Sequence, residues 1–279
     1  MIKIGEINKL KVIRKAEFGY YLNAETGNTS DDVLLPNKSA LGQKIEIDDE
    51  IEVFIYRDSE DRIIATMNMP LVTVGNIAYL EVVDKAKIGS FVNIGLERDV
   101  LVPFKEVTNK LEVGEKYLFA LYLDKTNRLA ATMKIDKYLH DTNSYDIGQE
   151  LEGTVYGFQT NGSAEVALEN TYRGVILKNE YYGRLKVGEE VKVRVKKYYE
   201  DGKVGVSLRK VRLEEKKDLE TQIYEYLKSN NGFMTLNDKS APQDIEKIFK
   251  TSKNAFKRAL GGLMKRKLIV QDSNGTKLL

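Results

Sequence analysis

The fold is decided by the stretch Tyr117-Leu-Phe-Ala-Leu-Tyr122, which is followed after a short turn by Arg128-Leu-Ala-Ala-Thr-Met133. The same pair of segments occurs upstream as Ile51-Glu-Val-Phe-Ile-Tyr56 and Arg62-Ile-Ile-Ala-Thr-Met67, and downstream as Val191-Lys-Val-Arg-Val-Lys196 and Lys203-Val-Gly-Val-Ser-Leu208. Two segments that recur in one order at three places indicate an internal repeat, and a repeat constrains the architecture before any other feature does.

Working outward, each repeat opens with a glycine, at Gly5, Gly75 and Gly148, so the two intervals are 70 and 73 residues. A second glycine, at Gly19, Gly89 and Gly162, follows with the same offsets. Each unit contains five short segments rich in Val, Ile and Tyr, separated by turn residues, which indicates five strands. Five strands in so short a unit favour a closed barrel of the OB type. The second glycine predicts a tight bend or a close approach of two backbones.

After Val211 the pattern changes from strands to helices. We expect a charged connector from Val211 to Lys217, and then a helix with apolar residues at helical spacing. Helices over 242–249 and from Ser252 to Lys267 follow, and a hairpin turns at Asn274-Gly275. This order is typical of a winged-helix domain. The sequence therefore predicts a mainly β protein with a C-terminal α+β domain: barrels at 1–70, 71–140 and 146–210, then a winged helix at 217–279.

Composition excludes several classes of site. The 279 residues include no cysteine, which rules out disulfides and thiolate metal sites, and a single histidine, His140, which rules out a zinc site built on several histidines. His140 lies in the connector between units two and three, where an exposed linker residue is the ordinary interpretation. We expect no metal, no cofactor and no contact with a membrane. With no apolar run of membrane-spanning length and no signal sequence at Met1, a cytoplasmic protein is expected.

Charge is distributed unevenly along the chain. The total of 44 Lys+Arg against 42 Asp+Glu gives only +2. Residues 1–147 hold 19 basic and 24 acidic residues (−5), residues 148–209 hold 10 and 9 (+1), and residues 210–279 hold 15 and 9 (+6). A polyanionic partner is therefore expected on the C-terminal half of the chain.

The third helix of the C-terminal domain separates into two faces. Phe256, Ala259, Leu260 and Leu263 form the apolar stripe, and Lys253, Lys257, Arg258 and Lys265 lie opposite. In a winged-helix domain this helix is the one that enters a nucleic-acid groove. A solvated, Lys-rich face of an ordinary surface helix is the other interpretation.

The third unit carries a row of cations on one strand. If the valines of the segment 191–197 point into the barrel, Lys192, Arg194 and Lys196 line its outside, where they could follow a phosphate backbone. Basic edge strands also protect sheets against aggregation, so both interpretations stand. Exposed aromatic rings supply base stacking in proteins that bind single strands, and the candidates are Phe18, Tyr21, Phe91, Tyr156 and Phe158. For each ring, burial in a core is the alternative.

A family resemblance rests on the third unit. Its segments Gly153-Thr-Val-Tyr-Gly-Phe158, Asn161-Gly-Ser163, 185–195 and Gly205-Val-Ser-Leu-Arg-Lys210 resemble the S1 RNA-binding domain. Three S1-like units followed by a winged helix resemble the conserved virulence factor B family of bacteria over the whole chain. The resemblance implies three OB-fold barrels and binding of single-stranded RNA, with the third S1-like unit and the winged helix acting together. It matches the two surface aromatics of the S1 pattern to Phe18 and Tyr21 and the second of them to Phe91. It matches the late Asp and Arg to Asp58 and Arg62, to Asp124 and Arg128, and, for the cation alone, to Lys203. The histidine of the pattern is absent, since Leu35, Val102 and Leu177 stand in its place.

These features favour a non-enzymatic RNA-binding protein, a bacterial post-transcriptional regulator that binds single-stranded RNA through the third barrel and the winged helix. The two acidic N-terminal barrels would then serve as a scaffold or contact another protein. A DNA-binding transcription regulator acting through the winged helix is the alternative. A nuclease is disfavoured, because the acidic clusters such as Asp48-Asp49-Glu50 fall in expected turns and do not recur between repeats.

Overall fold

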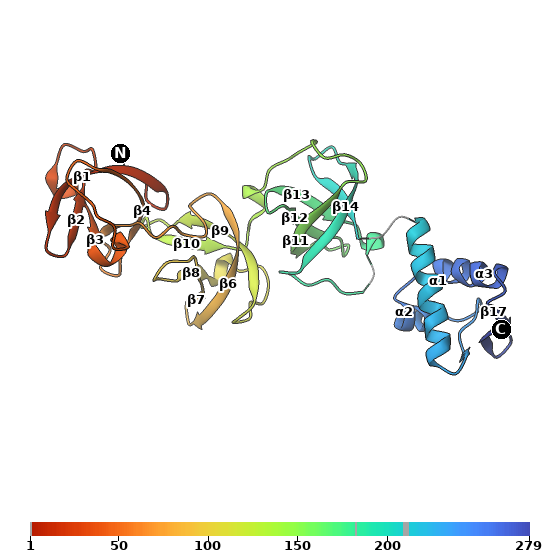
Figure 1. Cartoon of the computed structure of the whole chain (residues 1–279). Helices are drawn as coiled ribbons and strands as arrows, with labels where there is room; N and C mark the ends of the chain where they lie inside the picture. Colours follow the sequence, from red (N-terminus) through yellow and green to blue (C-terminus); the bar gives the residue numbers. More distant parts are fainter. Residues whose placement is uncertain (1, 182, 209–211) are drawn as a thin grey trace.

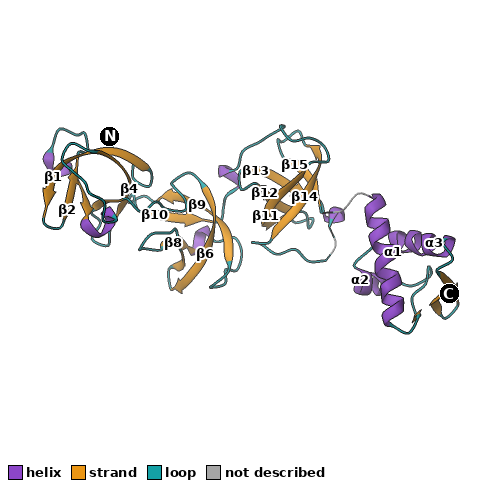
Figure 2. Ribbon diagram, in the orientation of Figure 1, coloured by secondary structure: helices purple, strands orange, loops and turns teal. Residues whose placement is uncertain are grey.

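Four bodies follow one another along the chain. The computed structural model describes residues 2–181, 183–208 and 212–279. Figure 1 shows three β-barrels in a row, from the red N-terminal barrel to the green third barrel, with a blue helical domain beyond them. Figure 2 shows that strands build the barrels, whereas helices dominate the last body. The predicted fold class is confirmed.

The three barrels share one strand order. Their strands are β1 (Ile7–Ala16), β2 (Gly19–Leu22), β3 (Val33–Pro36), β4 (Glu50–Arg57) and β5 (Ile63–Thr66); β6 (Ile77–Ala86), β7 (Gly89–Val92), β8 (Val100–Pro103), β9 (Lys116–Leu123) and β10 (Leu129–Thr132); and β11 (Glu150–Phe158), β12 (Ala164–Leu168), β13 (Tyr172–Ile176), β14 (Glu190–Tyr198) and β15 (Val204–Ser207). In each barrel the first strand pairs with the second and the fourth, and the third pairs in parallel with the fifth, so the sheet closes. Closure leaves no open sheet edge.

Every second side chain along the strands points inward, and these apolar side chains fill the barrels. In barrel 1 (β1–β5), Val53 and Ile55 of β4 point inward and are fully buried, and Val12, Leu22 and Leu35 join them in one core cluster. Barrel 2 (β6–β10) and barrel 3 (β11–β15) have equivalent clusters of their own. Successive residues of a strand point to opposite faces, so the valines of β14 face the core, as predicted.

Two of the repeated glycines allow strands to approach closely. A Cβ atom at Gly19 would lie 2.3 Å from the backbone oxygen of Leu35, and one at Gly89 would lie 2.1 Å from that of Val102. Any side chain there would displace the neighbouring strand. The expected close approach is therefore present in barrels 1 and 2. In barrel 3 the repeat differs, because Gly162 lies in the turn before β12 and Ala164 takes the first position of that strand.

The C-terminal domain has the winged-helix order of elements. It comprises α1 (Arg212–Ser229), β16 (Phe233–Met234), α2 (Pro242–Phe249), α3 (Lys253–Lys265), β17 (Ile269–Asp272) and β18 (Gly275–Leu278). The predicted connector was wrong from residue 212 onward, since α1 already begins at Arg212, and Val211 lies outside the described residues. Charged residues such as Arg, Glu and Lys form helices well, but they carry no apolar periodicity to reveal a helix. None of the described helices is long and apolar enough to cross a membrane.

Barrels 1 and 2 are joined by hydrogen bonds and ion pairs. The amide of Val74 donates to the Gly5 carbonyl at 2.8 Å. The Arg128 Nε donates to Asp61 Oδ1 at 2.9 Å, and Lys38 Nζ lies 2.5 Å from Glu97 Oε1. Each contact crosses from one barrel to the next, so the two barrels touch at three points.

Barrels 2 and 3 share an apolar contact. Leu118 and Ala120 of β9 point away from the barrel 2 core and are buried against Tyr156 and Ala167 of barrel 3. Leu139, in the connector, belongs to the same cluster. The Tyr79 hydroxyl also donates to the Gly188 carbonyl at 2.6 Å. The connector is therefore packed between the barrels, which agrees with the absence of a Gly/Ser tract in its sequence.

Candidate nucleic-acid interface

A cleft of about 450 Å³ lies where barrel 1 meets barrel 2, and we call it the first cleft. The end of β4 and the turn after it, Tyr56–Ser59, form one wall, and β7, β8 and β10 form the other. Three aromatic rings, four cations and three carboxylates line it: Tyr56, Phe91, Tyr122, Arg57, Arg98, Lys105, Arg128, Asp58, Asp99 and Asp124. Rings beside cations are the combination that binds bases and phosphates of a single strand.

Repeated turns hold one arginine in each of the first two barrels, and of the two only Arg128 lines the first cleft. Asp58 accepts hydrogen bonds from the Arg62 guanidinium at 2.9 and 2.7 Å, and the equivalent Asp124 accepts one from the Arg128 amide at 3.0 Å. The guanidinium of Arg128 reaches across to Asp61 of barrel 1. This hydrogen bond from Arg128 holds the pKa of Asp61 below its usual range. Both arginines keep more than half of their side chains exposed, so they remain accessible to an anion.

Arg57 lines the same cleft and carries a buried donor. Its Nη1 donates to the Asp61 carbonyl at 2.5 Å, which orients the guanidinium. Its Nε is buried and, among the residues that the structure describes, has no hydrogen-bond partner. A buried unsatisfied donor costs free energy, and because this atom is shut off from the surface of the cleft it is not itself a contact point for an anion.

Barrel 1 presents a second aromatic surface. The Phe18 ring is 57% exposed and stands edge-on to Tyr21, with 6.2 Å between ring centroids. The Arg14 guanidinium lies 3.8 Å from the centre of the Tyr21 ring, a cation–π contact. Tyr21 and Phe91 occupy the same position of the second strand, since they face Leu34 and Leu101 respectively. The predicted rings of Phe18, Tyr21 and Phe91 therefore lie on outer faces of barrels 1 and 2.

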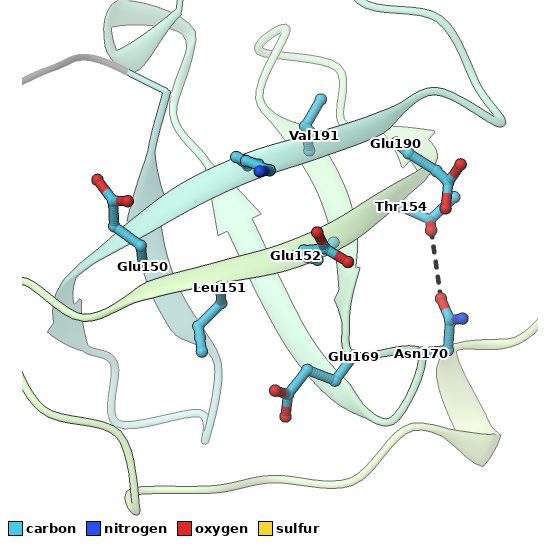
Figure 3. Close-up of a pocket in the computed structure, with 10 residues that line it drawn as sticks. Glu150, Leu151, Glu152, Thr154, Glu169, Asn170, Glu190 and Val191 are labelled. Atoms are coloured by element: carbon cyan, nitrogen blue, oxygen red, sulfur yellow. Dashed lines mark hydrogen bonds between the residues drawn. The ribbon is translucent and has the colours of Figure 1, made fainter.

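The predicted row of cations in barrel 3 does not form a positive surface. Antiparallel pairing sets Glu150 opposite Arg194 and Glu152 opposite Lys192, and Arg194 Nη2 lies 2.9 Å from Glu150 Oε1. A groove of about 750 Å³ runs over this face, and Figure 3 shows the carboxylates of Glu150, Glu152, Glu169 and Glu190 around it. Such a groove repels phosphates.

The other predicted cations of barrel 3 also lie near carboxylates. Lys196 Nζ is 3.9 Å from Glu180, and Lys203 Nζ is 3.4 Å from Asp201 with only a quarter of its side chain exposed. The alternation of valine with cations predicted the inward and outward faces of β14 correctly. It did not reveal the acidic strand β11 that pairs with β14.

The two predicted rings of barrel 3 have different environments. Tyr156 is 7% exposed between barrels 2 and 3, and its hydroxyl donates to Asp136 Oδ1 at 3.0 Å. Burial, reinforced by the carboxylates of Glu165 and Asp136, raises the pKa of Tyr156, so the hydroxyl stays protonated. Its ring is not available for stacking. Phe158, by contrast, is 41% exposed.

The third helix of the C-terminal domain has the two faces that the sequence predicts. Phe256, Ala259, Leu260 and Leu263 are buried, and the Ser252 side chain caps the helix by accepting from the Ala255 amide. On the outer side, Lys257 and Arg258 are exposed, as is Lys265. Lys257 lies 3.8 Å from Asp238, and Lys253 donates to the Lys239 carbonyl. Lys253 and Lys257 are thus anchored to the loop before α2.

Sequence reasoning missed several residues of the first cleft, namely Tyr56, Arg57, Arg98, Lys105 and Tyr122. One signal was present: the fourth strand of both units has Tyr at its last position but one, followed two residues later by Asp, at Tyr56/Asp58 and Tyr122/Asp124. Arg98 has no such repeat, and only the packing of two barrels brings it to the cleft. Within the described part of the chain, no group of three acidic or histidine side chains gathers to hold a metal ion.

Comparisons with known proteins identify the first two barrels and the C-terminal domain. Residues 4–68 and 74–134 match the S1 domain, and residues 221–278 match the CvfB-like winged helix domain. A Bacillus subtilis protein named "Uncharacterized protein YitL" is 34% identical over 98% of this chain and 92% of its own length. "Conserved virulence factor B" of Staphylococcus saprophyticus is 27% identical over 97% and 92%, respectively.

A solved structure has the same architecture. It is a crystal structure from Streptococcus pneumoniae, described as a multidomain protein with nucleic acid binding domains. It is 25% identical, covers 99% of this chain and 98% of its own, and superimposes with a TM-score of 0.51. Together with the relatives that match nearly end to end, it leads to one conclusion: the chain belongs to the conserved virulence factor B family, with S1 barrels and a CvfB-like winged helix.

Proposed function

We propose that the protein binds single-stranded RNA, with the first cleft as its principal site and the winged helix as a second contact. The observation that carries the proposal is the gathering of three aromatic rings and four cations in one cleft between two S1 domains. Bases would stack on the rings of Phe91 and Tyr122, and Arg98 and Lys105 would neutralise phosphates. The role is one of binding rather than catalysis, in keeping with the domain families that match.

The two contacts would act together. The exposed cations Lys257, Arg258 and Lys265 on α3 offer a second phosphate-binding surface on the same chain. When one site is occupied, the other meets the same strand at a high effective concentration, so that two modest affinities combine. A role as a bacterial post-transcriptional regulator follows if the bound strands are messenger RNAs in the cytoplasm.

Barrel 3 has a different role in this proposal than its S1-like sequence indicated. Its β11–β14 face is lined with carboxylates and would keep RNA away from that side of the molecule. The N-terminal half has a net charge of −5, whereas in the lining of the first cleft the four cations outnumber the three carboxylates Asp58, Asp99 and Asp124. Contacts with another protein remain available to the acidic surfaces.

The second candidate is a DNA-binding regulator that acts through the winged helix. It is favoured by the exposed basic side of α3, the helix that enters the groove in winged-helix proteins. Lysines dominate that side, whereas arginine, asparagine and glutamine are the usual readers of base edges. Competition between a single-stranded RNA and a duplex DNA of the same length separates the two candidates.

Fluorescence anisotropy with a labelled, unstructured RNA tests the proposal. Phe91→Ala should weaken binding about 5- to 150-fold, the range expected from removing one stacked base at about 1–3 kcal/mol. Ile88→Ala is the matched control, because Ile88 is an exposed apolar residue of the same barrel outside the first cleft. Unchanged RNA affinity in a folded Phe91→Ala variant would contradict the proposal.

A further inference from the structure

Barrel 2 has a second cleft, at its junction with barrel 3. This second cleft has a volume of about 510 Å³ and is lined by Lys134, Lys137 and Phe158, among others. Both clefts follow the parallel strands β8 and β10. Leu101 and Ala130, which face each other on these strands, line the first cleft, and residues just beyond the strand ends line the second.

The two clefts adjoin each other. Lys105 lines the first cleft and Lys134 the second, and the Lys134 ammonium donates a hydrogen bond to the Lys105 carbonyl. The Met133 amide also donates to the Glu106 carbonyl at 3.0 Å, which holds the same two segments together. Phe104 precedes Lys105 in the chain, and its ring is 61% exposed. A strand leaving the first cleft would therefore meet an exposed ring and a lysine before it reaches the second cleft.

The chemistry of the second cleft suits bases better than phosphates. Phe158 offers a ring that is 41% exposed, and Lys137 Nζ lies 4.8 Å from the centre of the Tyr138 ring. Two carboxylates, Asp136 and Glu165, balance the two lysines of the cleft. Asp136 is already engaged by the Tyr156 hydroxyl and lies 3.9 Å from Arg173. Stacking is sequence-tolerant and needs no net positive charge, so Phe158 is the residue on which a base would rest.

The spacing of the clefts is fixed by the packing of barrels 2 and 3. The hydrogen bonds Tyr79 to Gly188 and Tyr156 to Asp136 flank the shared apolar cluster. A ligand that spans both clefts would not have to order the barrels against each other when it binds. Such preorganisation reduces the entropic cost of a long contact.

We infer that one single strand of nucleic acid runs from the first cleft, past Phe104 and along β8 and β10, into the second cleft, where a base stacks on Phe158. The inference rests on the proposed function and extends it, because it makes barrels 1–3 one binding track. This track is longer than the binding site of a single OB fold, which covers at least about 4 nucleotides.

The test compares two labelled RNAs, of about 5 and about 12 nucleotides, bound to the full chain. The wild-type protein should bind the longer RNA more tightly. Phe158→Ala should weaken binding of the longer RNA about 5- to 150-fold and leave that of the shorter RNA unchanged. Ile147→Ala is the matched control, because Ile147 is an exposed apolar residue of barrel 3 that lines neither cleft.

Salt dependence gives an independent readout. Lys137 lines the second cleft together with Phe158, so Lys137→Gln should reduce the slope of log affinity against log salt for the longer RNA by about 0.7, the value for one phosphate contact on a single strand. Lys44→Gln, an exposed lysine of barrel 1, should not change it. If Phe158→Ala binds both RNAs like the wild type while Phe91→Ala weakens both, the track is wrong and the proposed function stands. If the wild-type protein binds neither RNA, both fail.

Discussion

Substitutions of Tyr156 test whether this side chain holds barrels 2 and 3 together or stacks on RNA. Its hydroxyl donates to Asp136 at 3.0 Å, and the ring is 7% exposed. A hydrogen bond to a charged group usually contributes about 1.5–3 kcal/mol to the free energy of unfolding. Asp136 is 57% exposed, so in Tyr156→Phe water can take the place of the lost hydroxyl as its partner. We therefore expect Tyr156→Phe to lower the free energy of unfolding by about 1 kcal/mol. Tyr156→Ala also removes a buried ring, at about 3–5 kcal/mol.

The assay is thermal unfolding, with RNA affinity measured in parallel on the same samples. A loss of about 1 kcal/mol should lower the melting temperature of the unit formed by barrels 2 and 3 by about 4 °C. Tyr156→Phe should bind a short RNA like the wild type, and Tyr199→Phe in barrel 3 serves as the matched control. If Tyr156→Ala melts like the wild type yet loses affinity for RNA, the ring is a stacking surface and the structural assignment is refuted.

Three further perturbations have defined outcomes. Gly89→Ala should destabilise barrel 2 by about 3 kcal/mol or more, because the new Cβ would meet the Val102 carbonyl at 2.1 Å, and chemical denaturation would reveal an early transition. Gly261→Ala should stabilise the C-terminal domain by about 1 kcal/mol in the same measurement, since a Cβ at this position in α3 meets open space; unchanged or lower stability would contradict this. Because the Arg128 hydrogen bond lowers the pKa of Asp61, their ion pair is complete above the usual range of an aspartate and is lost as the pH falls below that range; an NMR titration of the Asp61 carboxyl should therefore have its midpoint below the usual aspartate range, and Arg128→Gln should return it to that range.

The fold could be predicted from the repeat because each strand and helix shows its own periodic pattern in the sequence. Alternating valines in Val191–Lys196 place one face of β14 in the core, and the apolar residues of α3 fall at helical spacing. One further pattern in the sequence indicates the contact between barrels 2 and 3. The segment Tyr117–Tyr122 is apolar at every position, which is typical of a strand buried on both faces, and its outward residues Leu118 and Ala120 are indeed covered by barrel 3.

The site was harder to predict because it depends on contacts between units. Arg98 and Tyr56 lie far apart in the sequence and line the same cleft only because barrel 1 packs on barrel 2. Likewise, the charge of the Lys192 and Arg194 row depends on Glu152 and Glu150, which are placed opposite by strand pairing. The net charge of a segment depends neither on the packing of barrel 1 on barrel 2 nor on the pairing of β11 with β14. For this reason the charge distribution predicted a binding surface in the C-terminal half and not at the first cleft.

Photo-crosslinking of a single-stranded RNA to the unmodified full chain, followed by peptide mapping, tests the central claim most directly. We predict crosslinks in the peptides that carry Tyr56, Phe91 and Tyr122, at the first cleft. Crosslinks concentrated instead in β11 and β14, around Glu152 and Lys192, with none at the first cleft, would contradict it.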